Sequence, residues 1–236
     1  VFRQDLQRMS DSIAHRGPDG EGLHIQNHVG LAHRRLAILD LTPKGSQPMM
    51  SKDGRWIIVF NGCIYNYLEL KQDLRSKGHE FNSTSDTEVL VEGLAEYGPG
   101  FFERLNGMFA VGAYNTQEDA LFLSRDRYGV KPLYYWFTGE ELVFASEVKA
   151  IIAHPKYKKG INLGALNEYF TFQNMFTFQT LFKDVWMLPP ANTVRVDKSC
   201  THVKHQSWWD FDFSNTDESM SFQDAKEETE RLFKQA

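Results

Sequence analysis

The stretch that decides the fold of this chain is Ile57-Ile58-Val59-Phe60-Asn61-Gly62-Cys63-Ile64-Tyr65-Asn66. It begins with apolar residues that are β-branched or aromatic, the composition of a strand buried on both faces. Asn61-Gly62 then interrupts the apolar run, and Ile64-Tyr65 resumes it. Asn-Gly between apolar runs is the strongest short-range hairpin signal, so this window alone predicts a turn.

Asn61 and Gly62 also have a functional interpretation, which is compatible with a turn. Gly62 would let the backbone approach a ligand closely, because it has no Cβ. The Asn61 amide and the Gly62 N–H would then be two donors for a developing oxyanion. Cys63, next to them, is either a nucleophile or a small buried apolar residue. We favour the buried residue, because nothing in the sequence provides a base for it.

Composition indicates an ordinary soluble globular protein in a reducing compartment. The 236 residues are enough for one large domain or two small ones, and 42% are hydrophobic. The net charge of −5 argues against a nucleic-acid or anionic-membrane surface. Two cysteines are too few for a disulfide framework, and no apolar run is long enough to span a membrane. We therefore predict a cytoplasmic protein without nucleic-acid or membrane partners.

Hydrophobic periodicity predicts an α+β arrangement. Phe2, Leu6, Met9 and Ile13 recur at helical spacing, and Ser85 with Glu88 has the spacing of a capping box at a helix start. Further helices are predicted at 66–78, 146–152, 163–172 and 221–236, and strands at 23–26, 29–36, 57–60, 108–114, 120–124, 133–137, 142–145, 194–196 and 203–206. Strands in runs, with helices in blocks, indicate sheet packed on sheet with helices outside.

Arg35 and Asp86 are candidates for binding an amino acid. The guanidinium of Arg35 could pair two-pronged with an α-carboxylate, or it could be a surface arginine, as we expect for Arg34. Asp86 could receive an ammonium group, although stabilising the helix dipole is the commoner role at a helix start. With Asn61 and Gly62 on a side-chain carbonyl, these residues would form an amino-acid site with a reactive amide. Spacing alone does not bring them together.

Other polar clusters are interpreted as structural. Arg125-Asp126-Arg127, before Gly129 and Lys131-Pro132, is predicted to be a buried ion-pair corner. The eight histidines are scattered and neither cysteine has a partner at ligand spacing, so we predict no metal site. The sequence also lacks a Walker-type phosphate loop.

An ordered set of motifs carries a family resemblance over roughly residues 1 to 210. The motifs are His15-Arg16-Gly17-Pro18-Asp19, Arg35-Leu36-Ala37-Ile38-Leu39-Asp40, Asn61-Gly62-x-Ile64-Tyr65-Asn66, Ser85-Asp86-Thr87-Glu88, Gly107-Met108-Phe109-Ala110, Arg125-Asp126-Arg127-x-Gly129-x-Lys131-Pro132-Leu133-Tyr134 and Ala145-Ser146-Glu147-x-Lys149. Together they resemble the N-terminal glutaminase domain of glutamine-hydrolysing asparagine synthetases, a class II (Ntn-type) glutamine amidotransferase. Each motif alone would be a weak signal.

The resemblance implies a four-layer α-β-β-α sandwich of two antiparallel sheets. It also implies that an N-terminal Cys thiolate attacks the glutamine side-chain amide, with its own α-amino group as base. Arg35 would hold the substrate carboxylate, the backbone of Leu36, Ala37, Ile38 and Leu39 would line the pocket, Asp86 would meet the α-amine, and Asn61 with Gly62 would form the oxyanion hole. Ammonia would then pass to a synthetase domain in cis, which adenylates aspartate with ATP and Mg²⁺. No cofactor is implied for the glutaminase domain itself.

Two departures qualify these expectations. The nucleophilic Cys, expected in a short stretch before residue 1, is absent, and Val1 offers no nucleophile, so we expect this fragment itself to be inactive. Cys63 stands where the family usually has Glu beside the glutamine, which would alter substrate binding. We assign residues 1–209 to the amidotransferase domain and 210–236 to the linker and first helix of a truncated synthetase domain.

The leading hypothesis is glutamine hydrolysis that supplies ammonia for ATP-dependent amidation of aspartate. One alternative keeps the chemistry and changes the acceptor to another carboxylate, such as a sugar acid. A second alternative, from a different class, is a non-catalytic glutamine-binding module, with Cys63 as its best support. Homodimerisation stays open.

Overall fold

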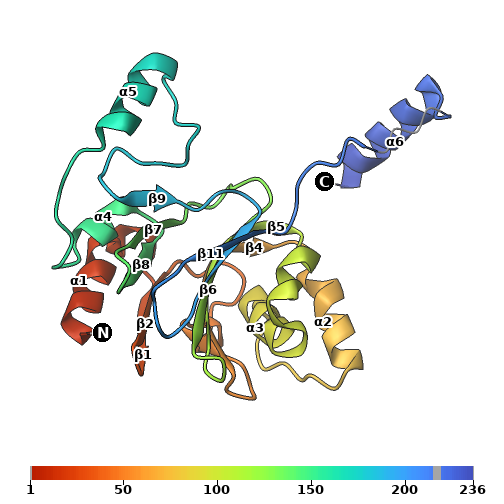
Figure 1. Ribbon diagram of the computed structural model, residues 1–236. Coiled ribbons are helices and arrows are strands. Elements are labelled where there is room, and N and C mark those ends of the chain that lie inside the picture. Colours follow the sequence, from red (N-terminus) through yellow and green to blue (C-terminus); the bar gives the residue numbers. More distant parts are fainter. Residues whose placement is uncertain (1, 215–218, 236) are drawn as a thin grey trace.

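A six-stranded antiparallel sheet forms the centre of the computed structural model, which describes residues 2–214 and 219–235 (Figure 1). Its strand order is β11-β10-β6-β5-β4-β3. The strands are β3 (Met49–Met50), β4 (Trp56–Ile64), β5 (Gly107–Asn115), β6 (Ala120–Arg125), β10 (Asn192–Val196) and β11 (Lys204–Ser207).

The second layer consists of two smaller antiparallel sheets. One is the hairpin of β1 (Gly20–Gln26) and β2 (Val29–Arg35), and the other has the order β8-β7-β9. Its strands are β7 (Tyr134–Phe137), β8 (Leu142–Ala145) and β9 (Val185–Met187). The layers are in close contact, because a Cβ added to Gly112 of β5 would lie 2.6 Å from the Phe144 ring of β8. The predicted α-β-β-α sandwich is therefore confirmed, although its second β layer consists of two separate sheets rather than one.

Helices cover the outer faces of both layers. On one side, α2 (Tyr67–Ser76), α3 (Asp86–Tyr97) and the 3₁₀ helix η3 (Gly98–Arg104) pack on the large sheet (Figure 1). On the other side, α1 (Arg3–Ser12) and α4 (Val148–Ile152) pack on the small sheets. Two helices, α5 (Leu163–Phe172) and α6 (Phe222–Gln235), project from the body, and the short 3₁₀ helices are η1 (Ala14–Arg16) and η2 (Pro43–Gly45). In the described ranges, no helix has the length and apolarity needed to cross a membrane.

The predicted turn at Asn61-Gly62 is wrong. Strand β4 runs through both residues and pairs with β5 over its whole length, with Asn61 opposite Ala110 and Gly62 opposite Phe109. A Cβ on Gly62 would lie 2.1 Å from the carbonyl oxygen of Met108. Glycine is therefore required here because the neighbouring strand comes so close, and this signal looks like a turn when the window is read alone.

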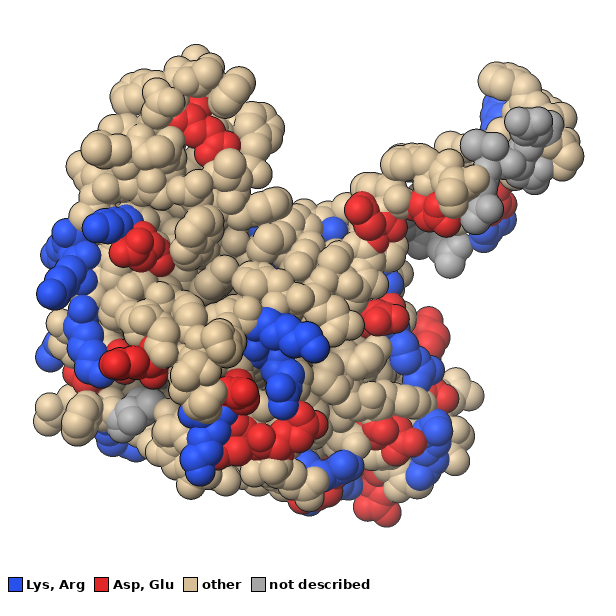
Figure 2. Space-filling view, in the orientation of Figure 1, with Lys and Arg blue, Asp and Glu red and all other residues tan. Residues whose placement is uncertain are grey.

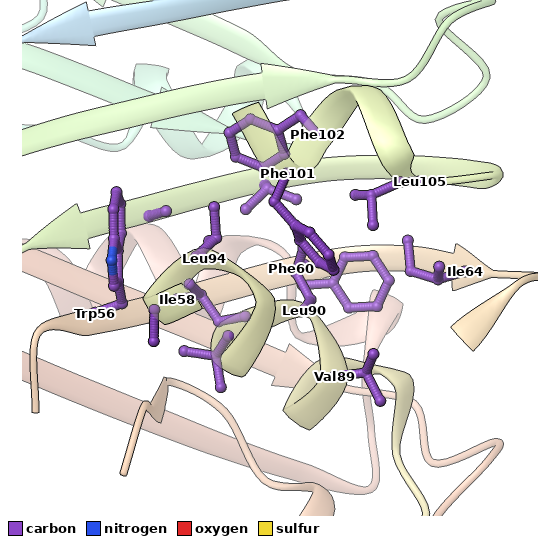
Figure 3. Packing of buried hydrophobic residues seen from close by; sticks show 14 of the residues in the cluster. Trp56, Ile58, Phe60, Ile64, Val89, Leu90, Leu94, Phe101, Phe102 and Leu105 are labelled. Carbon is purple, nitrogen blue, oxygen red and sulfur yellow. The ribbon is translucent and has the colours of Figure 1, made fainter. Parts of the chain in front are cut away.

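The two faces of β4 have different neighbours. Trp56, Ile58, Phe60 and Ile64 join the largest buried cluster, under α3 and η3, where Figure 3 shows them against the apolar residues of both helices. Because side chains alternate along a strand, the odd-numbered residues point the other way. Ile57 and Val59 accordingly pack in a second cluster with Leu31 and Tyr114. Asn61 and Cys63 follow on that same face.

The capping box predicted at the start of α3 holds only in part. The Ser85 hydroxyl caps α3 by accepting from the Thr87 N–H at 3.1 Å. Glu88, predicted to complete a capping box, instead accepts from the N–H groups of Asn82 and Ser83. The loop before the helix turns back over its first turn, so the carboxylate reaches other backbone donors first.

The prediction that Arg125-Asp126-Arg127 forms a buried ion-pair corner is wrong, because these side chains bond to backbone groups. Arg125 donates to backbone carbonyls of Lys131, Leu188 and Gly129, and Arg127 donates to those of Leu105 and Glu103. The Asp126 carboxylate accepts backbone N–H groups of Phe109, Tyr128, Val130 and Lys131. The charges are therefore satisfied by backbone groups of the surrounding loops rather than by one another.

Gly93 of α3 allows a test of this packing. A Cβ there would lie 2.0 Å from the fully buried ring of Phe101, so Gly93→Ala should overpack the core. Overpacking costs about 1–3 kcal/mol, which the better helix propensity of alanine offsets only in part, by about 1 kcal/mol. We expect urea denaturation to show a lower free energy of unfolding. The matched control is Gly100→Ala, whose added Cβ meets nothing within 4 Å; equal stability of the two variants would contradict the packing.

Candidate functional site

A cavity of about 700 Å³ lies between the two sheet layers. Its lining comes from α1, β2, β8, the middle of β4 and β5, the start of α3, and the loop that follows β2. Strand β2 has only β1 as a paired strand, and β8 has only β7, among the strands that the structure describes. The cavity is therefore bordered by two strands that each have one edge without a partner strand, except that Arg35 at the end of β2 forms an isolated bridge with Pro18.

The predicted site residues meet at this cavity, with one exception. Lining residues include Arg35, Leu36, Ile38, Leu39, Asn61, Gly62, Cys63 and Asp86. Ala37 is not among them, and its N–H donates to the Asp19 carboxylate at 2.9 Å. Residues from β2, β4 and α3 are thus brought together although they are far apart in the sequence.

On either side of Gly62, side chains accept hydrogen bonds from the backbone N–H groups at the outer edge of β4. The Phe60 N–H donates to Gln47 Oε1 at 2.6 Å, and the Ile64 N–H donates to Asp86 Oδ2 at 3.0 Å. Alternate residues of a strand direct their N–H groups to the same edge, so the Gly62 N–H points outward between these two. No described residue accepts from it. Gly62 therefore presents a free backbone donor at the edge of the cavity.

Asn61 supplies a second free donor next to it. Its Nδ2 is buried and has no hydrogen-bond partner among the described residues. A buried amide without an acceptor is costly, and such a group in a cavity indicates an oxygen of a ligand as its partner. Asn61 Nδ2 and Gly62 N–H are thus suited to bind an oxyanion, because both are held by a strand paired on its other edge.

Asp86 and Cys63 meet at the C-terminal end of β4: Cys63 is a residue of the strand, and Asp86 accepts from the N–H of the next residue, Ile64. Burial raises the pKa of Asp86, although the N–H of Ile64 opposes this shift. Burial also raises the pKa of the Cys63 thiol, and the nearby Asp86 carboxylate adds to the rise. A thiol with a raised pKa is a weak nucleophile at neutral pH. The raised pKa therefore argues against Cys63 as the nucleophile, but Cys63 is half-buried and lines the cavity, so the prediction of a buried residue holds only in part.

Arg35 is held in place by the loop that follows it. Its guanidinium donates to the carbonyl oxygens of Thr42, at 2.9 Å, and Asp40. Asp40 in turn accepts from Thr42 and from the Thr84 N–H, and these bonds lower the pKa of its carboxyl to about 2. Arginine has five N–H donors, so this arrangement leaves donors for a ligand carboxylate. Arg34, expected to be a surface arginine, also lines the cavity, and its side chain is only 15% exposed because it pairs with Asp11 and Glu21.

Gln47 and His33 complete the site, and the sequence did not single out either residue. Gln47 satisfies both the N–H and the carbonyl of Phe60, and His33 Nε2 donates to the same carbonyl at 3.2 Å. Burial lowers the pKa of His33 to about 4, and its Nδ1 is buried without a described partner. No local pattern marks these residues, because their partner lies on another strand.

The described residues do not assemble a metal centre: no group of three or more His, Cys, Asp or Glu side chains among them could hold an ion.

Comparison with known proteins gives consistent matches. The family model described as glutamine amidotransferase domain matches residues 2–209. Asparagine synthetase [glutamine-hydrolyzing] 3 of Bacillus subtilis is 35% identical over 99% of the chain, and the chain covers 38% of that relative. Asparagine synthetase [glutamine-hydrolyzing] 2 of the same organism is 45% identical over 86% of the chain, which covers 28% of it. The chain thus spans well under half the length of these relatives.

A solved structure shows the same fold. The glutamine phosphoribosylpyrophosphate amidotransferase from B. subtilis has a TM-score of 0.61 and 20% sequence identity over 86% of this chain, which covers 46% of that chain.

The buried histidine predicts a pH dependence of stability. The pKa of His33 is about 4 in the folded chain against an ordinary 6.5, so the unfolded chain binds its proton first as the pH falls. Above pH 6.5 His33 is neutral in both the folded and the unfolded chain and does not lower the free energy of unfolding. As the pH falls towards 4, protonation of His33 in the unfolded chain lowers the free energy of unfolding. Between pH 7 and 4.5 this loss amounts to about 2–3 kcal/mol. We expect His33→Gln, which can still donate to Phe60, to lose that much less in denaturation experiments. Parallel profiles for both proteins would contradict this account.

Proposed function

Because this chain belongs to the glutamine amidotransferase domain family, we propose that its cavity is the site where glutamine is hydrolysed to glutamate and ammonia. The observation that carries the proposal is a pair of donors on β4: the buried Asn61 Nδ2, which has no partner among the described residues, and the Gly62 N–H, which points outward between the bonded N–H groups of Phe60 and Ile64. A tetrahedral intermediate of amide hydrolysis carries negative charge on one oxygen. Two preorganised donors in a site shielded from water stabilise that charge strongly.

The remaining groups fit the rest of the substrate. Arg35 would bind the α-carboxylate of glutamine through N–H groups that the Asp40–Thr42 loop leaves free. Asp86 would bind the α-ammonium group. Its pKa is raised by burial in the chain described here, and a nearby ammonium would lower it again. Substrate and carboxylate would thus stabilise each other's charge.

We assign the nucleophile to the thiol of a Cys in a segment preceding Val1, as the family resemblance implies. Its attack on the side-chain carbonyl carbon would form the oxyanion, loss of ammonia would leave a thioester, and water would release glutamate. The free edges of β2 and β8 support this assignment, because both border the cavity. An extended segment between them would pair with both strands and join the two small sheets.

For the whole protein, we propose that the ammonia serves amidation of aspartate. This proposal rests on the names of the relatives, which are asparagine synthetases. ATP and Mg²⁺ would bind in a downstream synthetase domain in cis, and we assign no residue of this domain to them. Residues 210–236 would be the linker and first helix of that domain. Cys63 and Cys200 are both free thiols, which supports a reducing cytoplasmic compartment.

Replacing Asn61 tests the oxyanion role. In the full-length protein, Asn61→Ala should lower kcat for glutamate release by about 10²–10³-fold, because the lost bond is strongest in the transition state. The KM for glutamine should change much less. Asn167→Ala, at an exposed position of α5, is the matched control and should retain normal kinetics. Wild-type kcat in Asn61→Ala would refute the role.

Replacing Asp86 tests substrate binding. Asn at this position keeps an acceptor for the Ile64 N–H and removes the charge. A hydrogen bond to a charged group contributes about 1.5–3 kcal/mol, so Asp86→Asn should raise the KM or Kd for glutamine about 10–100-fold. Calorimetry with glutamine on full-length protein measures this directly. Saturable binding that depends on Asp86, without glutamate release, would identify a non-catalytic binding module instead.

A further inference from the structure

Asp40 is a buried carboxylate that hydrogen-bonds to uncharged groups. Figure 2 shows acidic side chains at the surface of the body, several of them beside Lys or Arg. Asp40 differs from these, because it is only 7% exposed and accepts from the N–H and hydroxyl groups of Thr42 and Thr84. Burying a carboxylate is costly unless such bonds satisfy it, so its place in the fold requires an explanation.

The two oxygens of this carboxylate hold two different segments of the chain. Oδ1 accepts from the N–H and the hydroxyl of Thr42, at 2.8 and 2.6 Å, which closes a local turn. Oδ2 accepts from the N–H and the hydroxyl of Thr84, at 3.0 and 3.3 Å, although this residue is 44 positions away. A turn needs only the first pair of bonds. The second pair joins the loop that follows β2 to the segment that precedes α3.

The first of these segments holds the group assigned to the substrate carboxylate. Arg35 ends β2 in the second layer, whereas Asp86 begins α3, which covers the large sheet (Figure 1). The carbonyl oxygens of Asp40 and Thr42 accept from the Arg35 guanidinium. A Cβ on Gly45 would lie only 2.5 Å from Arg35 Nη2. The loop therefore fits closely around the guanidinium, and a shift of the loop would move it.

The second segment leads directly into the group assigned to the substrate ammonium. Thr84 stands two residues before Asp86 in the sequence. Glu88, in the first turn of α3, accepts from the N–H of Ser83 at 2.7 Å, so the segment before the helix is fixed to the helix. Asp40 is thus linked on each side to one of the two charged groups that would bind the substrate.

We propose that Asp40 is a positioning residue that sets the separation of Arg35 and Asp86 to fit the carboxylate and ammonium groups of a single α-carbon. The inference rests on the glutaminase site proposed above, and it adds a residue that determines which amides this site accepts. An ionised carboxylate suits the position because both of its oxygens act only as acceptors. The Thr42 hydroxyl, with the N–H groups of Thr84 and Thr42, lowers the pKa of Asp40 to about 2, which keeps it ionised at neutral pH.

Asparagine at this position breaks one of the two links. Asp40→Asn leaves a single acceptor oxygen and directs an NH₂ group at the donors of either Thr42 or Thr84. A substrate with both charged groups then meets Arg35 and Asp86 at the wrong separation. A substrate with only one charged group can shift to suit its remaining partner. Because a misplacement of about 1 Å can cost up to about 10²-fold in rate, the loss should fall mainly on glutamine.

Kinetics and calorimetry on the full-length protein test the proposal. The probes are glutamine, glutaramate, which lacks the α-amino group, and 4-aminobutanamide, which lacks the carboxylate. In Asp40→Asn, the preference for glutamine over each analogue, as a ratio of kcat/KM and of Kd, should fall roughly tenfold. The kcat for glutamine should change much less, because the oxyanion donors lie on β4. These ratios do not depend on the fraction of folded protein, so a merely structural role for Asp40 would leave them unchanged.

A second variant and a control accompany Asp40→Asn. Thr42→Val removes one bond to Oδ1 and keeps the other, so the preference should fall in the same direction by less. This variant measures the same link if Asp40→Asn does not fold. Asp53→Asn is the matched control, because the Asp53 carboxylate also accepts from a hydroxyl and an N–H, of Ser51 and Arg55, but is not a lining residue of the cavity. Its preference for glutamine should equal that of the wild type.

The outcomes separate this proposal from the proposed function. An unchanged preference in the variants that fold, in a protein whose wild type releases glutamate, would overturn the role of Asp40 alone. A wild type that binds glutamine in preference to both analogues and releases no glutamate would refute the glutaminase alone, and the Kd ratios would still decide the role of Asp40. A wild type without any preference for glutamine would contradict both proposals.

Discussion

The pairing of β4 with β5 is the constraint on which the rest of the structure depends. The strands approach so closely at Gly62 that no Cβ fits against the Met108 carbonyl, and this holds β4 straight through a sequence that favours a turn. A straight β4 places Phe60 and Ile64 under α3 and turns Asn61 towards the cavity. Core and site are thus opposite faces of one strand. Substitution at Gly62 would disturb both together.

The candidate site follows from how buried polar groups of β4 are satisfied. Beyond β3 the outer edge of β4 has no strand partner among the described elements, so Gln47 and Asp86 take over the hydrogen bonds of Phe60 and Ile64. Only the Gly62 N–H, between them, is left for a ligand, with the Asn61 amide beside it. Leaving buried donors unpaired costs free energy unless a ligand pairs with them. The edge therefore combines rigidity with two free donors, which is what stabilising a developing charge requires.

The charged side chains fall into two groups, one that holds the loops of the framework and one that faces the cavity. Hydrogen bonds to backbone groups satisfy the charged side chains of Arg125, Asp126 and Arg127, and these bonds hold the loops around the sandwich in place. Arg35 and Asp86 keep contact with the cavity while loop groups hold them in position. The framework and the candidate site thus use different charged residues.

By itself, the sequence determined most of the secondary structure, the layered α+β fold and, through its ordered motifs, the family and the residues around the cavity. These are local properties: apolar period, helix caps such as Ser85, and short motifs whose residues lie close in the chain. Only the tertiary structure decided that Asn61-Gly62 continues a strand, that Gln47 and His33 support its edge, and that Arg125 and Asp126 bond to backbone rather than to each other. The first two depend on the approach of a distant segment, whereas Arg125 and Asp126 bond mainly to the loop of residues 128–131 that follows them. A partner more than ten positions away leaves no trace in the local pattern.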